Sequence, residues 1–229
     1  MSESAMSDSV TTGAVTNRPV VLLGYGGHAR VVLDTLRALG AEVAGILAPD
    51  LPVGDRWEGI PVLGDDDWTR RPEAIQYHYS LGVGMLPQRP HLRQRLFSLL
   101  RERQLRMPPL VHPSAVLAPD VVLGEGTQVM AGVIVQPGSV IGENVLLNTR
   151  ATVDHHCRID AHVHVGPGAI LCGEVQLGER VFVGAGATLI QGIDIGAGAQ
   201  VAAGATVVRN IAAGIRHIPG HLPIRIEEA

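Results

Sequence analysis

A six-residue hydrophobic repeat runs through the second half of the chain. From Val111 to Val207, every sixth residue is valine, leucine or isoleucine, seventeen positions without one insertion. The residue four places after each aliphatic position is usually small or β-branched, and glycine often falls three places after it. A period of six fits no α-helix, whereas it fits short strands that are separated by tight turns of the kind glycine permits.

Three such units predict one triangular coil of a parallel β-helix. The aliphatic side chains would then stack in rows inside the prism, where each buried one contributes about 1.5–3 kcal/mol. Each coil would pair its strands with the coils above and below it. We therefore expect residues 107–229 to form a β-helix domain that ends in a short C-terminal segment.

The hydrophobic pattern changes in the first half of the chain, where buried strands alternate with an amphipathic helix. The pattern predicts strands at 19–24, 42–50, 59–68 and 75–84, and helices at 28–40 and 87–105, the latter basic. The turn GYGGHA (24–29) joins the first strand to the first helix, and a helix N-terminus of this kind suits a phosphate.

These elements predict a Rossmann-like βαβ domain over residues 18–106, preceded by a disordered tail over residues 1–17. The glycine turn alone is a weak signal for dinucleotide binding. No complete doubly wound domain follows it, because the chain enters the repeat after some 90 residues.

Composition excludes several classes of function. A net charge of −4 gives no reason to expect nucleic acid or an anionic membrane as partner, and no apolar run is long enough to span a membrane. The chain has no lysine, which excludes pyridoxal Schiff-base chemistry and the P-loop lysine. Cys157 and Cys172 lack zinc-ribbon spacing, so we expect a reduced, cytoplasmic protein, with Cys157 in a packing position.

A polar segment lies within the repeat at VDHHCRIDAHVH (153–164), which holds four of the ten histidines. The aliphatic positions 153 and 159 stay in step, so only outward or turn positions have changed. Such a change is expected where a repeat scaffold carries a site on its surface.

The combination of GxGGHAxVV in the first domain and NTxAxVDHxC in the repeat resembles the PglD/NeuD-type bacterial sugar acetyltransferases, a family with hexapeptide repeats. The resemblance implies a left-handed β-helix, a homotrimer with active sites between subunits, acetyl-CoA as cosubstrate and no metal. It implies N-acetylation of the 4-amino group of a UDP- or GDP-linked amino-dideoxy sugar for surface polysaccharide.

The resemblance also implies roles for individual residues. His155 matches the general base of the family, a role that suits a group with a pKa near neutrality. His156 stands where many relatives carry an acidic residue that orients this base. A histidine is no permanent anion, so either Asp154 or another carboxylate takes over, or the base is less polarised here.

The remaining site residues match the family on its coenzyme and nucleotide sides. For acetyl-CoA they are His164, Gly173 with its backbone N–H toward the thioester oxygen, Ala185 and Ala203. For the substrate they are Gly26, Gly27 and His28 near the sugar diphosphate, Asp50 near ribose or base, and Asn148 near the reacting groups.

Three alternatives stay open from the sequence. The residues do not decide between N-acetylation and O-acetylation of a sugar such as sialic acid. Histidines 155, 156, 162 and 164 also suit a zinc hydratase of the γ-carbonic-anhydrase type. A third possibility is a non-catalytic trimeric scaffold that only binds a nucleotide sugar.

Overall fold

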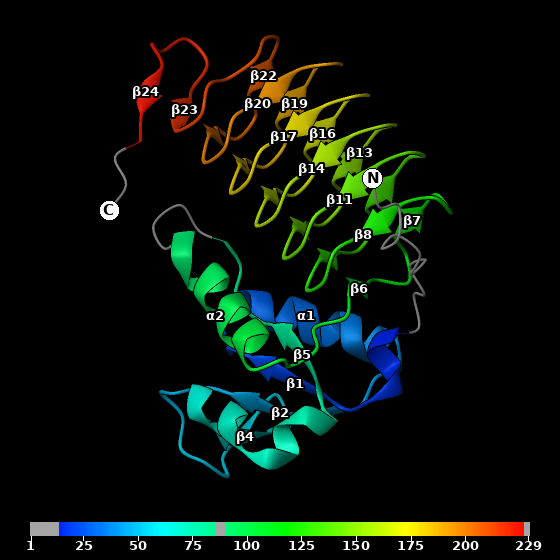
Figure 1. The fold of residues 1–229 in the computed structure, drawn as a ribbon, viewed down its shortest axis with the longest axis vertical. Coiled ribbons are helices and arrows are strands. Elements are labelled where there is room, and N and C mark those ends of the chain that lie inside the picture. The colour runs from blue at the N-terminus through cyan, green and yellow to red at the C-terminus, as the bar shows by residue number, and fades with distance from the viewer. Residues whose placement is uncertain (1–13, 86–89, 227–229) are drawn as a thin grey trace, which may run out of the picture.

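The computed structural model describes residues 14–85 and 90–226, which form a small N-terminal domain beneath a long prism of coils (Figure 1). The elements of the first domain are η1 (Ala14–Asn17), β1 (Val20–Leu23), α1 (Gly27–Ala38), β2 (Val43–Leu47), β3 (Arg56–Trp57), β4 (Ile60–Gly64), η2 (Asp66–Arg70), η3 (Pro72–Gln76), β5 (His78–Leu81) and α2 (Pro90–Glu102). Among the described residues, no helix is long and apolar enough to cross a membrane.

The predicted βαβ unit is present as β1, α1 and β2. The strands lie in the order β3-β4-β2-β1-β5, with β1 parallel to both β2 and β5. The chain therefore adds β2 and β4 on one side of β1 and β5 on the other, so the strand order reverses beside β1. In open parallel sheets the crevice beyond the carboxyl ends of the strands at such a point is the usual place for a ligand, and the glycine turn lies there.

Two predicted segments of this domain differ in the structure. The strand expected over 59–68 stops at Gly64, because Asp65 accepts a hydrogen bond from the Asp67 N–H and begins the 3₁₀ helix η2. Pro72 then starts η3, which delays the next strand until His78.

The expected disordered tail is wrong for its last residues. Residues 14–17 form η1, and Val15 is buried against the sheet core with an exposed fraction of 2%. The rest of that predicted tail, residues 1–13, lies outside the described residues.

The prism has three faces of parallel strands. The first, which we call the docked face, consists of β6 (Leu110–Val111), β9 (Gln128–Val129), β12 (Leu146–Leu147), β15 (His164–Val165), β18 (Phe182–Val183), β21 (Gln200–Val201), β23 (Ile215–His217) and the antiparallel β24 (Ile224–Arg225). Helix α1 packs between this face and the N-terminal sheet, where Val32 and Leu36 share a core with Leu110 and Leu146.

The second face, called the apolar face, consists of β7 (Val116–Leu117), β10 (Ile134–Val135), β13 (Thr152–Val153), β16 (Ile170–Leu171), β19 (Thr188–Leu189) and β22 (Thr206–Val207). The outward residues of these strands are all valine, isoleucine or threonine, and Val116, Ile134 and Ile170 are exposed.

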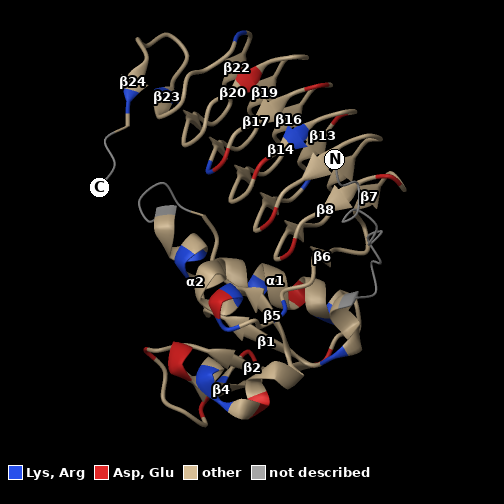
Figure 2. Cartoon of the chain, in the orientation of Figure 1, with Lys and Arg blue, Asp and Glu red and all other residues tan. Residues whose placement is uncertain are grey.

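The third face, called the polar face, consists of β8 (Val122–Leu123), β11 (Val140–Ile141), β14 (Arg158–Ile159), β17 (Gln176–Leu177) and β20 (Asp194–Ile195). Its outward side chains include Arg158, Gln176 and Asp194, all exposed. Apart from Arg216 on β23 and Arg225 on β24, the charged residues elsewhere on the prism lie at the turns (Figure 2).

The interior confirms the six-residue prediction. Each repeated aliphatic residue is the second residue of its strand, and all but the half-buried Leu117 are buried. Pairing joins residues eighteen apart, as Leu146 with His164, so three repeats make one coil.

From Gly126 to Gly204 the turns also repeat with a period of six, because each contains one residue with a positive φ. Glycine holds this position at most turns, but Asn144, Arg150, His156, His162, Glu174 and Arg180 hold it in the middle coils, with φ between 54° and 63°. This conformation costs an L-residue roughly 1–2 kcal/mol relative to a right-handed one, so each of these polar side chains locally destabilises its turn.

Three edges join the faces. The edge between the apolar and polar faces carries residues 154–157 and is called the histidine edge. The edge between the docked and apolar faces carries Ala185 and Ala203 and is called the alanine edge. The third edge lies against α2, where Phe97 contacts His162.

The aliphatic rows generate a stability prediction. Leu177 is 1% exposed in the interior, whereas its neighbour Gln176 points outward from the polar face. We expect Leu177→Ala to lower the free energy of unfolding by about 2–5 kcal/mol, because it leaves a cavity in a close-packed row. Urea denaturation followed by circular dichroism measures this, and Gln176→Ala is the control, with a loss below about 0.5 kcal/mol. Equal losses for the two variants would contradict the assignment of the core.

Candidate active site

His155 and His156 lie side by side on the histidine edge. His156 takes the positive-φ turn position, with φ at 57°, and this turns its imidazole toward the ring of His155. The two Nδ1 atoms are 3.1 Å apart, and the rings meet edge to face with their centroids 5.3 Å apart. One Nδ1 therefore donates a hydrogen bond to the other, which couples the tautomers of the two histidines.

Glycines in the adjacent coils make room for both rings. The coil above is joined to this one by a hydrogen bond from the Glu174 N–H to the His155 carbonyl, 2.8 Å. A Cβ on Gly173 would lie 2.6 Å from Nε2 of His155, and one on Gly138 would lie 2.7 Å from Cδ2 of His156. A side chain at either position would displace the imidazole beside it, so glycine lets both rings keep their place, and Nε2 of His155 lies against Gly173.

The backbone N–H of Gly173 belongs to a residue that is buried in the single chain. None of the hydrogen bonds among the described residues uses it as a donor. It belongs to the turn one coil away from the turn that carries His155, and it can donate to an oxygen placed beside that ring.

Asp154 and Cys157 complete this turn without joining the imidazole pair. The Asp154 carboxylate accepts a hydrogen bond from the backbone N–H of His155 at 2.7 Å, so in this structure it holds the turn rather than the ring. Cys157 is fully buried, donates from Sγ to the Cys172 carbonyl at 3.3 Å, and has a pKa raised by burial to about 11. Its predicted packing role is confirmed.

The glycine turn of the first domain forms a second polar site. Gly26 and Gly27 are exposed at the start of α1, and a Cβ on either would meet nothing within 4 Å. No side chain caps this helix, and its first turn holds no acidic residue, so its N–H groups are open to an anion. Asp50 is exposed after β2 and accepts a hydrogen bond from the Tyr25 hydroxyl at 3.2 Å.

His28 follows this turn and points at the docked face of the prism. Its Nε2 lies 2.9 Å from Oε1 of Gln128 on β9, a contact that joins the two domains. Burial, reinforced by the positive charge of Arg93, lowers the pKa of His28 to about 4. His28 is therefore neutral at physiological pH.

His164 is buried on the docked face, between the two domains. Its Nε2 lies 3.5 Å from Nδ2 of Asn148, and its ring packs at 4.9 Å from that of Phe182. Burial first, then Arg93 and His28, lower the pKa of His164 to about 3. His164 and Asn148 were expected on the coenzyme side and near the reacting groups, and they do lie together.

One protomer does not bring all the predicted residues together. Asp154, His155, His156 and Gly173 lie on the histidine edge, opposite the docked face. His28, His164 and Asn148 lie on or beside the docked face, and Ala185 and Ala203 are exposed on the adjoining alanine edge. The candidate site is therefore split between two edges of the prism.

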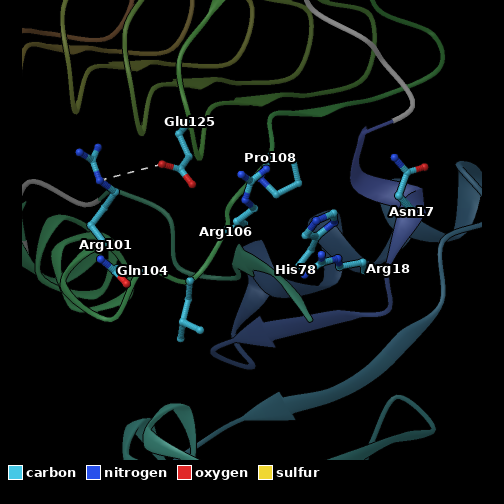
Figure 3. A pocket seen from close by; sticks show the side chains of 9 residues that line it. Asn17, Arg18, His78, Arg101, Gln104, Arg106, Pro108 and Glu125 are labelled. Carbon is cyan, nitrogen blue, oxygen red and sulfur yellow. Dashed lines mark ion pairs between the residues drawn. The ribbon is translucent and has the colours of Figure 1, made fainter. Parts of the chain in front are cut away.

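A cavity of about 750 Å³ lies elsewhere, between the N-terminal domain and the first coils (Figure 3). It is lined by Asn17, Arg18, His78, Arg101, Gln104, Leu105, Arg106, Pro108 and Glu125. Asn17, Arg18 and His78 lie at the amino ends of β1 and β5, the opposite end of the sheet from the glycine turn, and the other residues belong to the end of α2, the segment after it and the first coil. None of the predicted site residues lines this cavity.

Sequence reasoning missed Gln128 and Arg93. Gln128 points outward from the docked face. The residues paired with it in the two adjacent strands, Leu110 and Leu146, are aliphatic. Arg93 belongs to a basic helix yet has an exposed fraction of 0%. An amide between two leucines of the docked face was a signal for Gln128, but nothing in the spacing of α2 marked one arginine as buried.

Comparisons with known proteins identify relatives across nearly the whole chain. Residues 19–98 match the model of the PglD N-terminal domain. The chain is 35% identical to the acetyltransferase domain of PglB from Neisseria gonorrhoeae in complex with acetyl coenzyme A, covering 87% of this chain and 95% of that one with a TM-score of 0.79.

Two structures from Caulobacter crescentus are similar to the same extent. PerB in complex with CoA and GDP-perosamine is 40% identical over 87% of this chain and 93% of its own, with a TM-score of 0.77. A histidine-to-asparagine mutant of perosamine N-acetyltransferase, also in complex with CoA and GDP-perosamine, is 38% identical over 93% and 98%, with a TM-score of 0.80. The small domain followed by parallel coils is consistent with a left-handed β-helix acetyltransferase fold.

The buried histidines predict how stability depends on pH. The pKa of His164 is about 3 in the folded chain against an ordinary value of 6.5, so between these values only the unfolded chain binds the proton. Stability therefore falls as pH drops below about 6.5, and this one group accounts for about 2 kcal/mol between pH 7.5 and 5.0.

Urea denaturation of the wild type and of His164→Leu at pH 7.5 and 5.0 measures this contribution. His28, His78 and His162, whose pKa values are also lowered mainly by burial, act in the same direction in both proteins. We expect the loss of stability on acidification to be smaller in the variant by roughly 2 kcal/mol. An unchanged loss would show that His164 is protonated in the folded protein.

Proposed function

The chain belongs to the PglD-type bacterial sugar acetyltransferases, and from this premise we propose that it transfers the acetyl group of acetyl-CoA to the 4-amino group of a nucleotide-linked amino-dideoxy sugar. It is an acyltransferase. The observation that carries the proposal is the His155 ring, which lies against Gly173 with a free backbone N–H beside it. Because two relatives hold GDP-perosamine, a GDP-linked sugar is the first candidate and a UDP-linked sugar the second.

His155 acts as the general base in the proposed mechanism. The amine nitrogen of the sugar attacks the thioester carbonyl carbon, and Nε2 of His155 takes a proton from that nitrogen. The carbonyl oxygen becomes an oxyanion and accepts a hydrogen bond from the Gly173 N–H. When the tetrahedral intermediate collapses, the C–S bond breaks and the departing sulfur of CoA receives the proton from His155.

His156 orients the base in place of an acidic residue. For Nε2 of His155 to accept a proton, its Nδ1 must carry one, and the Nδ1 of His156 at 3.1 Å is the acceptor that fixes this tautomer. Asp154 is engaged with the backbone of His155 and supports the turn. A neutral His156 thus orients the ring of His155, whereas a carboxylate would orient that ring and also stabilise the positive charge it gains.

We propose a homotrimer of left-handed coils in which the site is shared between two copies. The apolar face carries no charged outward residue and is flanked by the histidine and alanine edges. If this face turns toward a three-fold axis, the histidine edge of one copy meets the alanine edge of the next in a closed ring. His155 and Gly173 of one copy then face Asn148, His164, Ala185 and Ala203 of its neighbour.

Acetyl-CoA would lie in the groove between these edges. Ala185 and Ala203 are stacked one coil apart, since the Gly204 N–H donates to the Ala185 carbonyl at 2.8 Å. Their small, exposed side chains leave the backbone of the alanine edge accessible to the coenzyme. Nucleotide binding would fall to Gly26, Gly27 and Asp50 at the carboxyl edge of the N-terminal sheet.

The test of the proposed function is release of CoA thiol from acetyl-CoA against a panel of GDP-, UDP- and dTDP-linked 4-amino sugars and their 4-hydroxy analogues. We expect turnover with a 4-amino sugar and a fall in kcat/KM of about 10²–10⁴-fold in His155→Asn. His91→Asn, an exposed residue of α2, is the control and should match the wild type. Turnover of the hydroxy analogues alone would identify an O-acetyltransferase, and no turnover in the panel would reject the proposal.

The shared site predicts complementation between two inactive variants. His155→Asn disables the histidine edge, and Ala185→Trp blocks the alanine edge, so homo-oligomers of either should be inactive. Random 1:1 co-assembly restores both native edges at about a quarter of the sites, because each edge comes from a different chain. The measurement is kcat per site after co-refolding or co-expression of the two variants. Activity that stays at the level of the separate variants would place the whole site within one chain.

A further inference from the structure

The side-chain amide of Gln128 is held in one orientation by partners that cannot exchange roles. Its Oε1 lies 3.0 Å from Nη1 of Arg93, a group that can only donate. Its Nε2 lies 2.9 Å from the Leu81 carbonyl, a group that can only accept, and 3.0 Å from the Ser80 hydroxyl. The oxygen of this amide therefore faces Arg93 and His28, and the nitrogen faces β5.

This orientation determines the tautomer of His28. Nε2 of His28 lies 2.9 Å from the same Oε1, an acceptor, so Nε2 must carry the proton. Because the ring is neutral, Nδ1 carries a lone pair and no proton. Nδ1 has no partner among the described residues, and His28 is only half-buried, so this nitrogen can accept a hydrogen bond from a ligand.

Arg93 makes the arrangement rigid. Its guanidinium is fully buried and has no carboxylate partner among the described residues. It donates to the Val83 carbonyl at 2.8 Å, to Gln128, and to the Gly126 carbonyl at 3.4 Å. It thus ties the end of β5 to the first coils of the prism. Its charge also opposes a second proton on His28.

We propose that Arg93 and Gln128 are positioning residues that fix His28 as a hydrogen-bond acceptor. Nδ1 of His28 then receives a hydrogen bond from a hydroxyl or amino group of the acceptor sugar and gives none to a phosphate oxygen. The inference rests on the proposed function for the identity of the substrate. It assigns His28, which follows the glycine turn, to the sugar, and leaves the diphosphate to the N–H groups at the start of α1.

Two substitutions separate the nitrogens of His28. In His28→Asn the amide lies where Nδ1 was and can turn its oxygen to the substrate, whereas in His28→Gln it reaches the place of Nε2 and leaves the place of Nδ1 empty. With GDP-perosamine, or whichever sugar the panel identifies, we expect kcat/KM for the sugar to fall about tenfold in His28→Gln and by less than about threefold in His28→Asn, with KM for acetyl-CoA unchanged in both. The opposite order, or no change in either variant, would overturn the proposal.

A measurement without substrate tests the tautomer itself. Long-range ¹H–¹⁵N correlation spectra of the ¹⁵N-labelled wild type should show one histidine with a protonated Nε2 and an unprotonated Nδ1, assigned by its loss in His28→Asn. In Gln128→Met this fixed pattern should be lost, while the His155→Asn variant keeps it. A protonated Nδ1 in the wild type would overturn the inference even in an active enzyme, and the expected pattern in a protein inactive with every sugar would reject the proposed function alone.

Discussion

The six-residue register of buried aliphatic side chains is the constraint on which the rest of this structure depends. Each row residue is the second of a two-residue strand, so every third repeat returns to the same face and every turn to the same edge. A residue inserted within a strand would turn the following side chains to the other face of that strand. The chemistry of the protein is therefore confined to positions that do not belong to the rows, namely the outward strand positions and the turns.

The three faces differ because each outward position has a different environment. The docked face alternates aliphatic residues with Gln128 and His164, which serve the contact with the N-terminal domain. The polar face carries charge and amide groups into solvent, while the apolar face carries none and exposes Ile134 and Ile170. One regular scaffold thus offers a surface for the N-terminal domain, one that carries charge and amide groups into water, and one that is apolar and exposed.

Much of this could be predicted from sequence, because the period of the rows sets the turns. His155 was placed at a turn, and the coils around it formed as expected. The split of the site could also have been read from the period, since His155 and His164 are nine residues apart in an eighteen-residue coil and so lie on opposite sides. Contacts between distant segments had no such signal. Phe97 covers His162, and Gln128 meets His28 a hundred residues away, only because α1 and α2 pack on the prism.

The polar junction between the domains explains why a fully buried guanidinium without a carboxylate is tolerated. Removing Arg93 from water is costly, and burial lowers its pKa only to about 9, so it stays charged at neutral pH. Its charge is balanced by carbonyl and amide oxygens at Val83, Gly126 and Gln128, which belong to both domains. An acidic partner would balance the charge better, but it would also draw a proton onto His28 and remove its lone pair. The junction therefore leaves Arg93 less stabilised than a carboxylate would, but it keeps the imidazole of His28 neutral. A neutral ring with a free Nδ1 is what the proposed hydrogen bond from the sugar requires.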